Sequence, residues 1–112
     1  MGADLYIRSI YKPAESGDEG YFRDPYNDWD LLWQFGLSWW EHVLPRLGQD
    51  DTLAVRDAEW LLDQLKRREK IFQQNIAEMS AEGQDHFRIR YERLQKFLNC
   101  AIERKEPILC SL

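Results

Sequence analysis

The stretch "YNDWDLLWQFGLSWWEHV", Tyr26 to Val43, holds four of the five tryptophans in the chain and decides how the fold is read. Projected at about 100° per residue, its apolar side chains fall on two faces. One face contains Trp29, Trp33, Gly36 and Trp40, and the other contains Leu32, Phe35, Trp39 and Val43. Only a narrow polar stripe separates them. We therefore expect a helix at the centre of the fold, with either both faces in the core or one face offered to a partner.

Signals for the ends of this helix lie on both sides of the stretch. Asn27 is a suitable N-cap, Asp30 stands where a capping-box partner is expected, and Tyr26 can pack on Leu31 as a hydrophobic staple. Pro45 and Gly48 follow, and proline cannot donate the interior hydrogen bond of a helix. The sequence predicts a first helix from about residue 27 to residue 44.

The rest of the chain has the apolar spacing of two longer helices. The second helix is expected over about residues 52–82, with Gly83 as the break and Asp85 as the cap of a third helix that ends before Pro107. The apolar positions of the two helices are Ala58, Leu61, Leu62, Leu65, Phe72, Ile76 and Met79, then Phe87, Tyr91, Leu94, Phe97, Leu98, Ala101 and Ile102. Together they predict a long antiparallel helical hairpin.

Both ends of the chain are β-prone. The segment from Ala3 to Tyr11 and the final "ILCSL" are rich in β-branched and aromatic residues, and pairing them would give each a partner. Between the first segment and the first helix, "KPAESGDEGYFRDPYND" has the composition of a loop. The predicted fold is a mainly α, three-helix arrangement with a short extended N-terminal and possibly C-terminal segment, in one domain over residues 1–112.

Composition limits the partners of the chain. The net charge is −5, and residues 1–51 carry ten acidic against four basic side chains, which makes nucleic acid an unfavourable partner. No run approaches the roughly 20 apolar residues of a membrane span, and no signal peptide is visible. Cys100 and Cys110 are expected to be free thiols. These features indicate a soluble cytoplasmic protein that does not bind a membrane.

No motif for catalysis, metal or cofactor binding is present. Glu41 and His42 are adjacent, so on a helix they point about 100° apart and cannot act on one atom. His86 follows Asp85 with the same limitation, and neither histidine belongs to a Glu-x-x-His pair. We expect no metal and no cofactor. If the protein has a ligand pocket beside the aromatic helix, its polar candidates are Glu41, His42 and His86.

Basic side chains can meet across the hairpin. "KRREK", Lys66 to Lys70, and the group Arg88, Arg90, Arg93 and Lys96 are interleaved with acids, which favours a solvated, salt-bridged face. The same face would suit an acidic protein partner. Arg67 and Arg90 are therefore candidate partner-binding residues.

The lengths of the predicted helices favour a second copy of the chain. The second helix would be about 45 Å long at roughly 1.5 Å per residue, and the first only a little over half of that. The apolar stripe left uncovered must be shielded by the N-terminal segment, by another copy or by a different protein. We favour a homodimer on this ground.

The opening "MGADLYIRSIY" resembles the start of a group of small uncharacterised bacterial and phage proteins that begin Met-Gly-Ala-Asp-Leu-Tyr-Ile. The resemblance covers the first 11 residues. It implies a bacterial or phage origin and transfers no functional residue to this chain.

The sequence as a whole predicts a protein–protein interaction module of adaptor, immunity or inhibitor, or phage accessory type. Tryptophan and tyrosine dominate interface hot spots, and the basic face suits an acidic partner, so the predicted contact residues are Trp29, Trp33, Trp40, Arg67 and Arg90. The alternative is a small-molecule-binding protein or enzyme that uses a pocket beside the aromatic helix.

Overall fold

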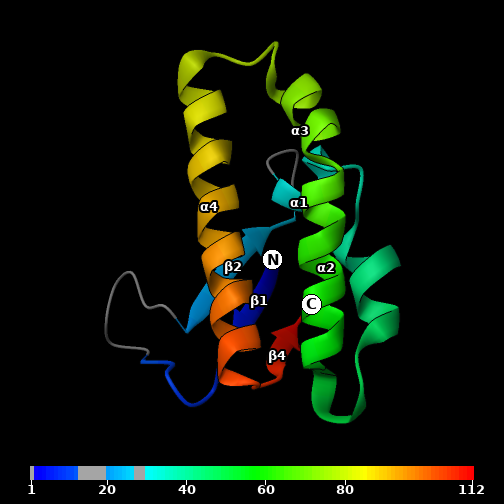
Figure 1. The fold of residues 1–112 in the computed structure, drawn as a ribbon. Coiled ribbons are helices and arrows are strands. Elements are labelled where there is room, and N and C mark those ends of the chain that lie inside the picture. Colours follow the sequence, from blue (N-terminus) through cyan, green and yellow to red (C-terminus); the bar gives the residue numbers. More distant parts are fainter. Residues whose placement is uncertain (1, 13–19, 27–29) are drawn as a thin grey trace.

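A computed structural model of the chain describes residues 2–12, 20–26 and 30–112. It contains a four-stranded antiparallel sheet together with several helices (Figure 1). The prediction of a mainly α, three-helix bundle is therefore wrong, and the fold is mixed α/β. The error came from treating the terminal segments as minor additions to a helical core, whereas they form the centre of a sheet.

The sheet has the strand order β2-β1-β4-β3. Its strands are β1 (Gly2–Tyr6), β2 (Tyr21–Pro25), β3 (Thr52–Leu53) and β4 (Ile108–Ser111). β1 pairs with β4 with Leu5 opposite Cys110, so the predicted pairing of the two ends is confirmed. β2 lies in the segment predicted to be a loop, and that prediction is wrong for residues 21–25. Its tyrosine and phenylalanine suit a strand, but the neighbouring glycine and proline concealed it.

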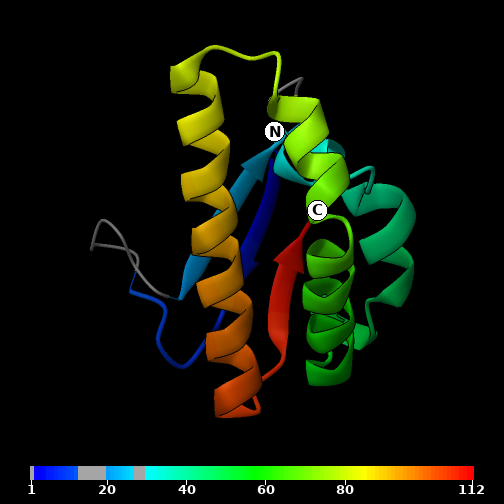
Figure 2. The same ribbon diagram turned by 45° about the horizontal axis from the view of Figure 1, so that its top comes forward.

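Two longer helices cover one face of the sheet. α2 (Val55–Arg67) and α4 (Ala81–Arg104) lie side by side, and α3 (Glu69–Ile76) continues the direction of α2 (Figure 2). Side chains of β1 alternate, so that Ala3 and Leu5 are fully buried beneath the helices while Asp4 and Tyr6 lie on the other face. The core is a single cluster between the helices and this inner face of the sheet.

The aromatic stretch is not one helix. α1 covers only Leu31–Gln34, with Asp30 as its N-cap, and a separate π-helical turn, η1, covers Trp39–Val43 with Ser38 as its N-cap. Between them Gly36 has a φ of +73°, a left-handed conformation that glycine adopts without steric cost and that ends a helix. The expected N-cap, Asn27, lies outside the described residues.

The buried and exposed side chains of this stretch nevertheless match the two faces of the helical projection. Leu32, Phe35, Trp39 and Val43 are all buried, whereas Trp33 and Trp40 are 64% and 52% exposed. After η1 the chain makes two 3₁₀ turns, η2 (Leu44–Arg46) and η3 (Gln49–Asp51), before β3.

The ends of the helices in the hairpin also differ from the predicted ones. The second predicted helix is interrupted at Arg68, which has non-helical φ and ψ of −105° and 12°, and α3 ends at Ile76. α4 starts earlier than predicted, because the Ser80 side chain accepts the Gly83 N–H at 3.1 Å and caps it. Gly83 is therefore inside the first turn of α4, and Asp85 is not the cap. At the other end Lys105 is left-handed, two residues before Pro107.

The sheet removes the argument for a second copy of the chain. The apolar faces of α2, α3 and α4 share one core with the inner face of the sheet and the aromatic segment, where the Phe35 ring stacks on Phe72 of α3 at 4.4 Å. No stripe of the hairpin core therefore requires a partner helix. Within residues 2–12, 20–26 and 30–112, none of the helices is long and apolar enough to cross a membrane.

A substitution in β1 tests this architecture. Leu5→Ala should lower the free energy of unfolding by about 3 to 5 kcal/mol, because it leaves a cavity at the centre of the sheet. Leu44→Ala, at an exposed position, should change it by less than about 0.5 kcal/mol. Urea unfolding followed by circular dichroism measures both, and equal effects of the two substitutions would contradict the position of β1.

Candidate functional site

A buried carboxylate connects the edge strand β2 to the aromatic segment and to α4. Asp24 is fully buried, and its oxygens accept hydrogen bonds from backbone amides of α1 and from side chains of distant elements. The donors are the N–H of Leu31 at 2.9 Å, the N–H of Leu32 at 3.2 Å, Nε1 of Trp39 at 2.7 Å and Nη2 of Arg90 at 2.8 Å. We call these five residues the Asp24 cluster.

The composition of the cluster follows from local structure. Strand alternation turns Phe22 and Asp24 of β2 inward, which would bury a charge at high cost if nothing compensated it. The first turn of α1 offers amides that have no partner within the helix, and the Arg90 guanidinium supplies the counter-charge. Arg90 also donates to the Arg23 carbonyl oxygen at 2.7 Å, which fixes β2 to α4.

Asp30 lies next to this cluster and has an unusual pKa. Its carboxylate oxygen accepts the Leu32 N–H at 3.0 Å as the N-cap of α1. Burial, a hydrogen bond with Asp24 and the charge of Asp24, in decreasing order of effect, together raise the pKa of Asp30 to about 8. Asp30 is thus mainly protonated at neutral pH and can donate to the Asp24 carboxylate.

The two exposed tryptophans come from the elements that the Asp24 cluster holds. Trp33 lies in α1, whose first amides bind Asp24, and Trp40 follows Trp39, whose indole binds it. The Trp40 ring packs edge-on against Tyr26 at a centroid distance of 6.1 Å. Their backbones are therefore fixed although their rings face solvent. Trp29, the third predicted contact residue of this face, lies outside the described residues.

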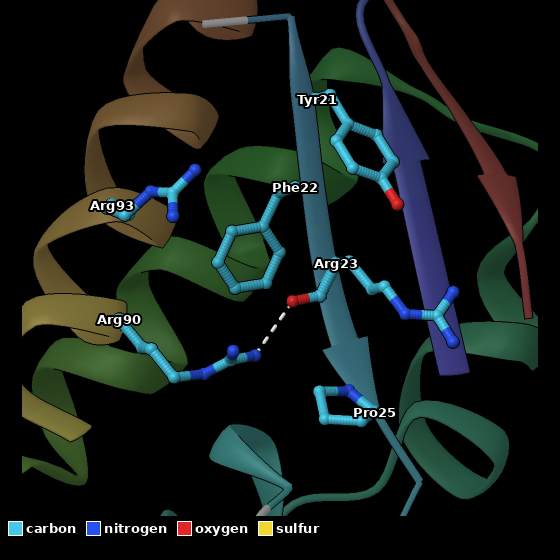
Figure 3. Close-up of a pocket in the computed structure, with 6 residues that line it drawn as sticks. All are labelled: Tyr21, Phe22, Arg23, Pro25, Arg90 and Arg93. Carbon is cyan, nitrogen blue, oxygen red and sulfur yellow. Dashed lines mark hydrogen bonds between the residues drawn. The ribbon is translucent and has the colours of Figure 1, made fainter. Parts of the chain in front are cut away.

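A pocket opens on the other side of the cluster, between β2 and α4 (Figure 3). Its volume is about 290 Å³, and its lining residues are Tyr21, Phe22, Arg23, Pro25, Arg90 and Arg93. We call it the arginine pocket. Figure 3 shows Arg90 and Arg93 approaching Phe22 from α4, while the Tyr21 and Arg23 side chains lie on the β1 side of β2.

The predicted pocket residues do not line this pocket. Glu41 is exposed, and His42 uses Nδ1 to accept the Ser38 N–H at 3.0 Å, a structural role at the start of η1. His86 is exposed in the first turns of α4, with its ring 5.2 Å from that of Phe87. The described part of the chain contains no group of three His, Cys, Asp or Glu side chains that could hold a metal ion.

The two predicted basic contact residues are in different environments. Arg67 forms an exposed ion pair with Asp63 at 2.8 Å within α2, whereas Arg90 is mostly buried in the Asp24 cluster. Sequence reasoning missed Asp24 and gave Arg93 no separate role. The alternation in "YFRDP" was the available signal, since it places Phe22 and Asp24 on the same face of a strand.

No protein-family model, curated protein or solved structure matches the chain. The resemblance of the first 11 residues to small bacterial and phage proteins stays a prediction.

Removing the charge of Asp24 should be strongly destabilising. Asp24→Asn leaves the Arg90 guanidinium buried without its counter-charge and should lower the free energy of unfolding by about 3 kcal/mol or more. Asp63→Asn removes the same charge from the exposed pair with Arg67 and should cost less than about 1 kcal/mol. Urea unfolding at pH 7 compares them, and similar losses would show that the Asp24 cluster does not hold the fold.

The raised pKa of Asp30 predicts a pH dependence of stability. From about pH 4 to about pH 8 the folded protein keeps the Asp30 proton that the unfolded chain has released. Folding is therefore favoured at the acidic end, and the free energy of unfolding should fall as the pH rises through this range. Asp30→Asn should flatten the profile, because asparagine still caps α1 but does not ionise. Urea titrations at a series of pH values measure this for the wild type and for Asp30→Asn. If the free energy of unfolding changes with pH in the same way in both proteins, Asp30 does not keep its proton in the folded state.

Proposed function

We propose that the protein binds another protein and that Trp33 and Trp40 are the main contact residues. The observation that carries this proposal is their exposure, 64% and 52%, within residues 30–43, whose other large apolar side chains are buried. Tryptophan is enriched among the residues that dominate binding energy, because its ring buries a large area with few rotatable bonds.

The fixed backbone of this segment supports the proposal. Ordering a mobile loop on binding costs conformational entropy, and that cost is subtracted from the affinity. The Asp24 carboxylate already holds the first turn of α1 and the Trp39 indole, so Trp33 and Trp40 are presented on a preorganised backbone. A partner would have to order only the two rings.

Charge indicates the chemistry of the partner. Residues 24–45 contain no lysine or arginine, and exposed Glu41 directly follows Trp40. A lysine or arginine of the partner could lie over an indole face, and tryptophan is the best aromatic side chain for this cation–π contact. We infer a protein partner with a surface that is both apolar and basic. Adaptor, immunity or inhibitor, and phage accessory roles all fit such a protein.

The two arginines predicted as contact residues have no part in this proposal. Arg90 is held by Asp24 and by the Arg23 carbonyl, and Arg67 is paired with Asp63. Their basic side chains would also repel the partner that the acidic segment favours.

Quantitative affinity capture from the native host tests the proposal. Replacing both Trp33 and Trp40 with alanine should lower recovery of the partner at least about tenfold, equivalent to about 1.4 kcal/mol, with little change in the melting temperature. The matched control is Ile89→Ala, which removes an equally exposed apolar side chain from α4 and should leave recovery unchanged.

Two results would contradict the proposal. One is partner recovery by the double variant that equals that of the wild type. The other is an equal loss of partner recovery with Ile89→Ala, which would show that the capture reflects non-specific binding by exposed apolar side chains.

A further inference from the structure

The arginine pocket lies along the outer edge of β2, which pairs with no second strand among the described residues. The Ile7 N–H donates to the Gly20 carbonyl oxygen at 2.8 Å, and the register places Leu5 opposite Phe22. In an antiparallel pair successive residues face alternate sides, so the backbone groups of Phe22 point toward β1 and those of Tyr21 and Arg23 point away from it. The Arg23 carbonyl oxygen is occupied by Arg90. The Arg23 N–H therefore faces the pocket as a hydrogen-bond donor.

The arginines of the pocket are not equivalent. Asp24 balances the charge of Arg90, and Asp4 balances that of Arg23 through an ion pair of 2.8 Å. Arg93, three residues after Arg90 on α4, is exposed and forms no ion pair with any residue of the described ranges. Arg93 thus leaves the pocket with one positive charge that no side chain of the described residues balances.

Arg90 also retains a donor that the fold does not use. Its Nη2 serves Asp24 and Arg23, but its Nε is buried and has no hydrogen-bond partner. Buried donors without a partner are rare, because each costs the free energy of its lost hydration. The Arg90 guanidinium carbon lies 5.6 Å from the centroid of the buried Phe22 ring. The Arg90 side chain therefore forms part of the pocket wall beside the Phe22 ring, while its buried Nε is out of reach of a ligand.

Size and charge together define the ligand class. A volume of about 290 Å³ equals that of roughly ten water molecules at about 30 Å³ each, enough for a small apolar group with one acidic group. Phe22 and Pro25 would contact the apolar part. One unbalanced charge matches a carboxylate better than a dianionic phosphate, and planar guanidinium groups suit carboxylate oxygens.

We propose that the arginine pocket binds a carboxylate carried by a compact apolar group, such as the C-terminal residue of an extended peptide segment. Arg93 supplies the charge, the Arg23 N–H supplies a hydrogen-bond donor, and Phe22 supplies the apolar contact. This site is separate from Trp33 and Trp40, so failure of either proposal would leave the other unaffected. The carboxylate could come from a peptide end or from a free small acid, and the experiment below distinguishes these sources.

Titration of the ¹⁵N-labelled protein, followed by amide chemical shifts, tests the inference. The probes are acetyl-Ala-Val-Leu with a free carboxylate, the same peptide as its C-terminal amide, and 4-methylpentanoate, each at up to about 10 mM. We expect the free-acid peptide to shift the amides of Phe22 and Arg23 and to bind at least about tenfold more tightly than the amide. Binding of the peptide acid alone would identify a peptide end as the source, and binding of both acids would identify a general carboxylate site.

Matched variants on α4 complete the test. Arg93→Gln should weaken binding of the acid probe at least about tenfold, because it removes the unbalanced charge at an exposed position that the fold does not use. Arg88→Gln, on the same helix but paired with Asp85 outside the pocket, should bind as the wild type does. Three results would overturn the inference: equal binding of peptide acid and amide, no shift with either acid, or unchanged binding by the Arg93→Gln variant.

Discussion

The fold depends on one buried carboxylate. Asp24 sits on the inner face of an edge strand, where a charge without partners would be strongly destabilising. It accepts hydrogen bonds from the first turn of α1, from the Trp39 indole and from Arg90 of α4, 66 residues away in the sequence. A single side chain therefore fixes the edge of the sheet, the broken aromatic segment and the longest helix relative to one another. The neighbouring carboxyl of Asp30 stays compatible with this charge because its raised pKa keeps it protonated.

Both proposed binding regions derive their geometry from this cluster. On one side it holds the backbones that carry Trp33 and Trp40, and on the other it holds Arg90 against Phe22. Arg90 can bind the Asp24 carboxylate and the Arg23 carbonyl at once because a guanidinium has several donors in a rigid plane, whereas a lysine would offer a single point charge. The two regions also differ in charge. The tryptophans lie in a segment without basic residues and suit a cationic partner, whereas the pocket carries an unbalanced arginine and suits a carboxylate.

Part of this arrangement could be predicted from the sequence. Apolar spacing identified the buried positions of both long helices, and the projection of the aromatic stretch separated the buried Leu32, Phe35, Trp39 and Val43 from the exposed Trp33 and Trp40. Pairing of the two ends followed from their β-prone composition. The break at Gly36 could not be predicted in this way, because glycine is tolerated inside helices. The tertiary contacts that hold the chain on both sides of the turn come from distant residues such as Asp24, Arg68 and Asn75. Strand β2 was not predicted because it is only five residues long, and the nearby glycine and proline give the segment the composition of a loop. The argument for a dimer failed for the same reason, since the undetected sheet covers the hairpin. The cluster itself joins residues distant in sequence, which no local pattern reveals.

The exchange rate of the Trp39 indole N–H tests the central role of Asp24 most directly. This proton is buried and donates to the Asp24 carboxylate at 2.7 Å, whereas the rings of Trp33 and Trp40 face solvent. Hydrogen exchange of the assigned indole signals in ¹⁵N-labelled protein should show Trp39 exchanging at least about 100-fold more slowly than Trp33 and Trp40. Equal exchange rates for the three indoles would contradict the account, because they would show that Trp39 is not held against a buried carboxylate.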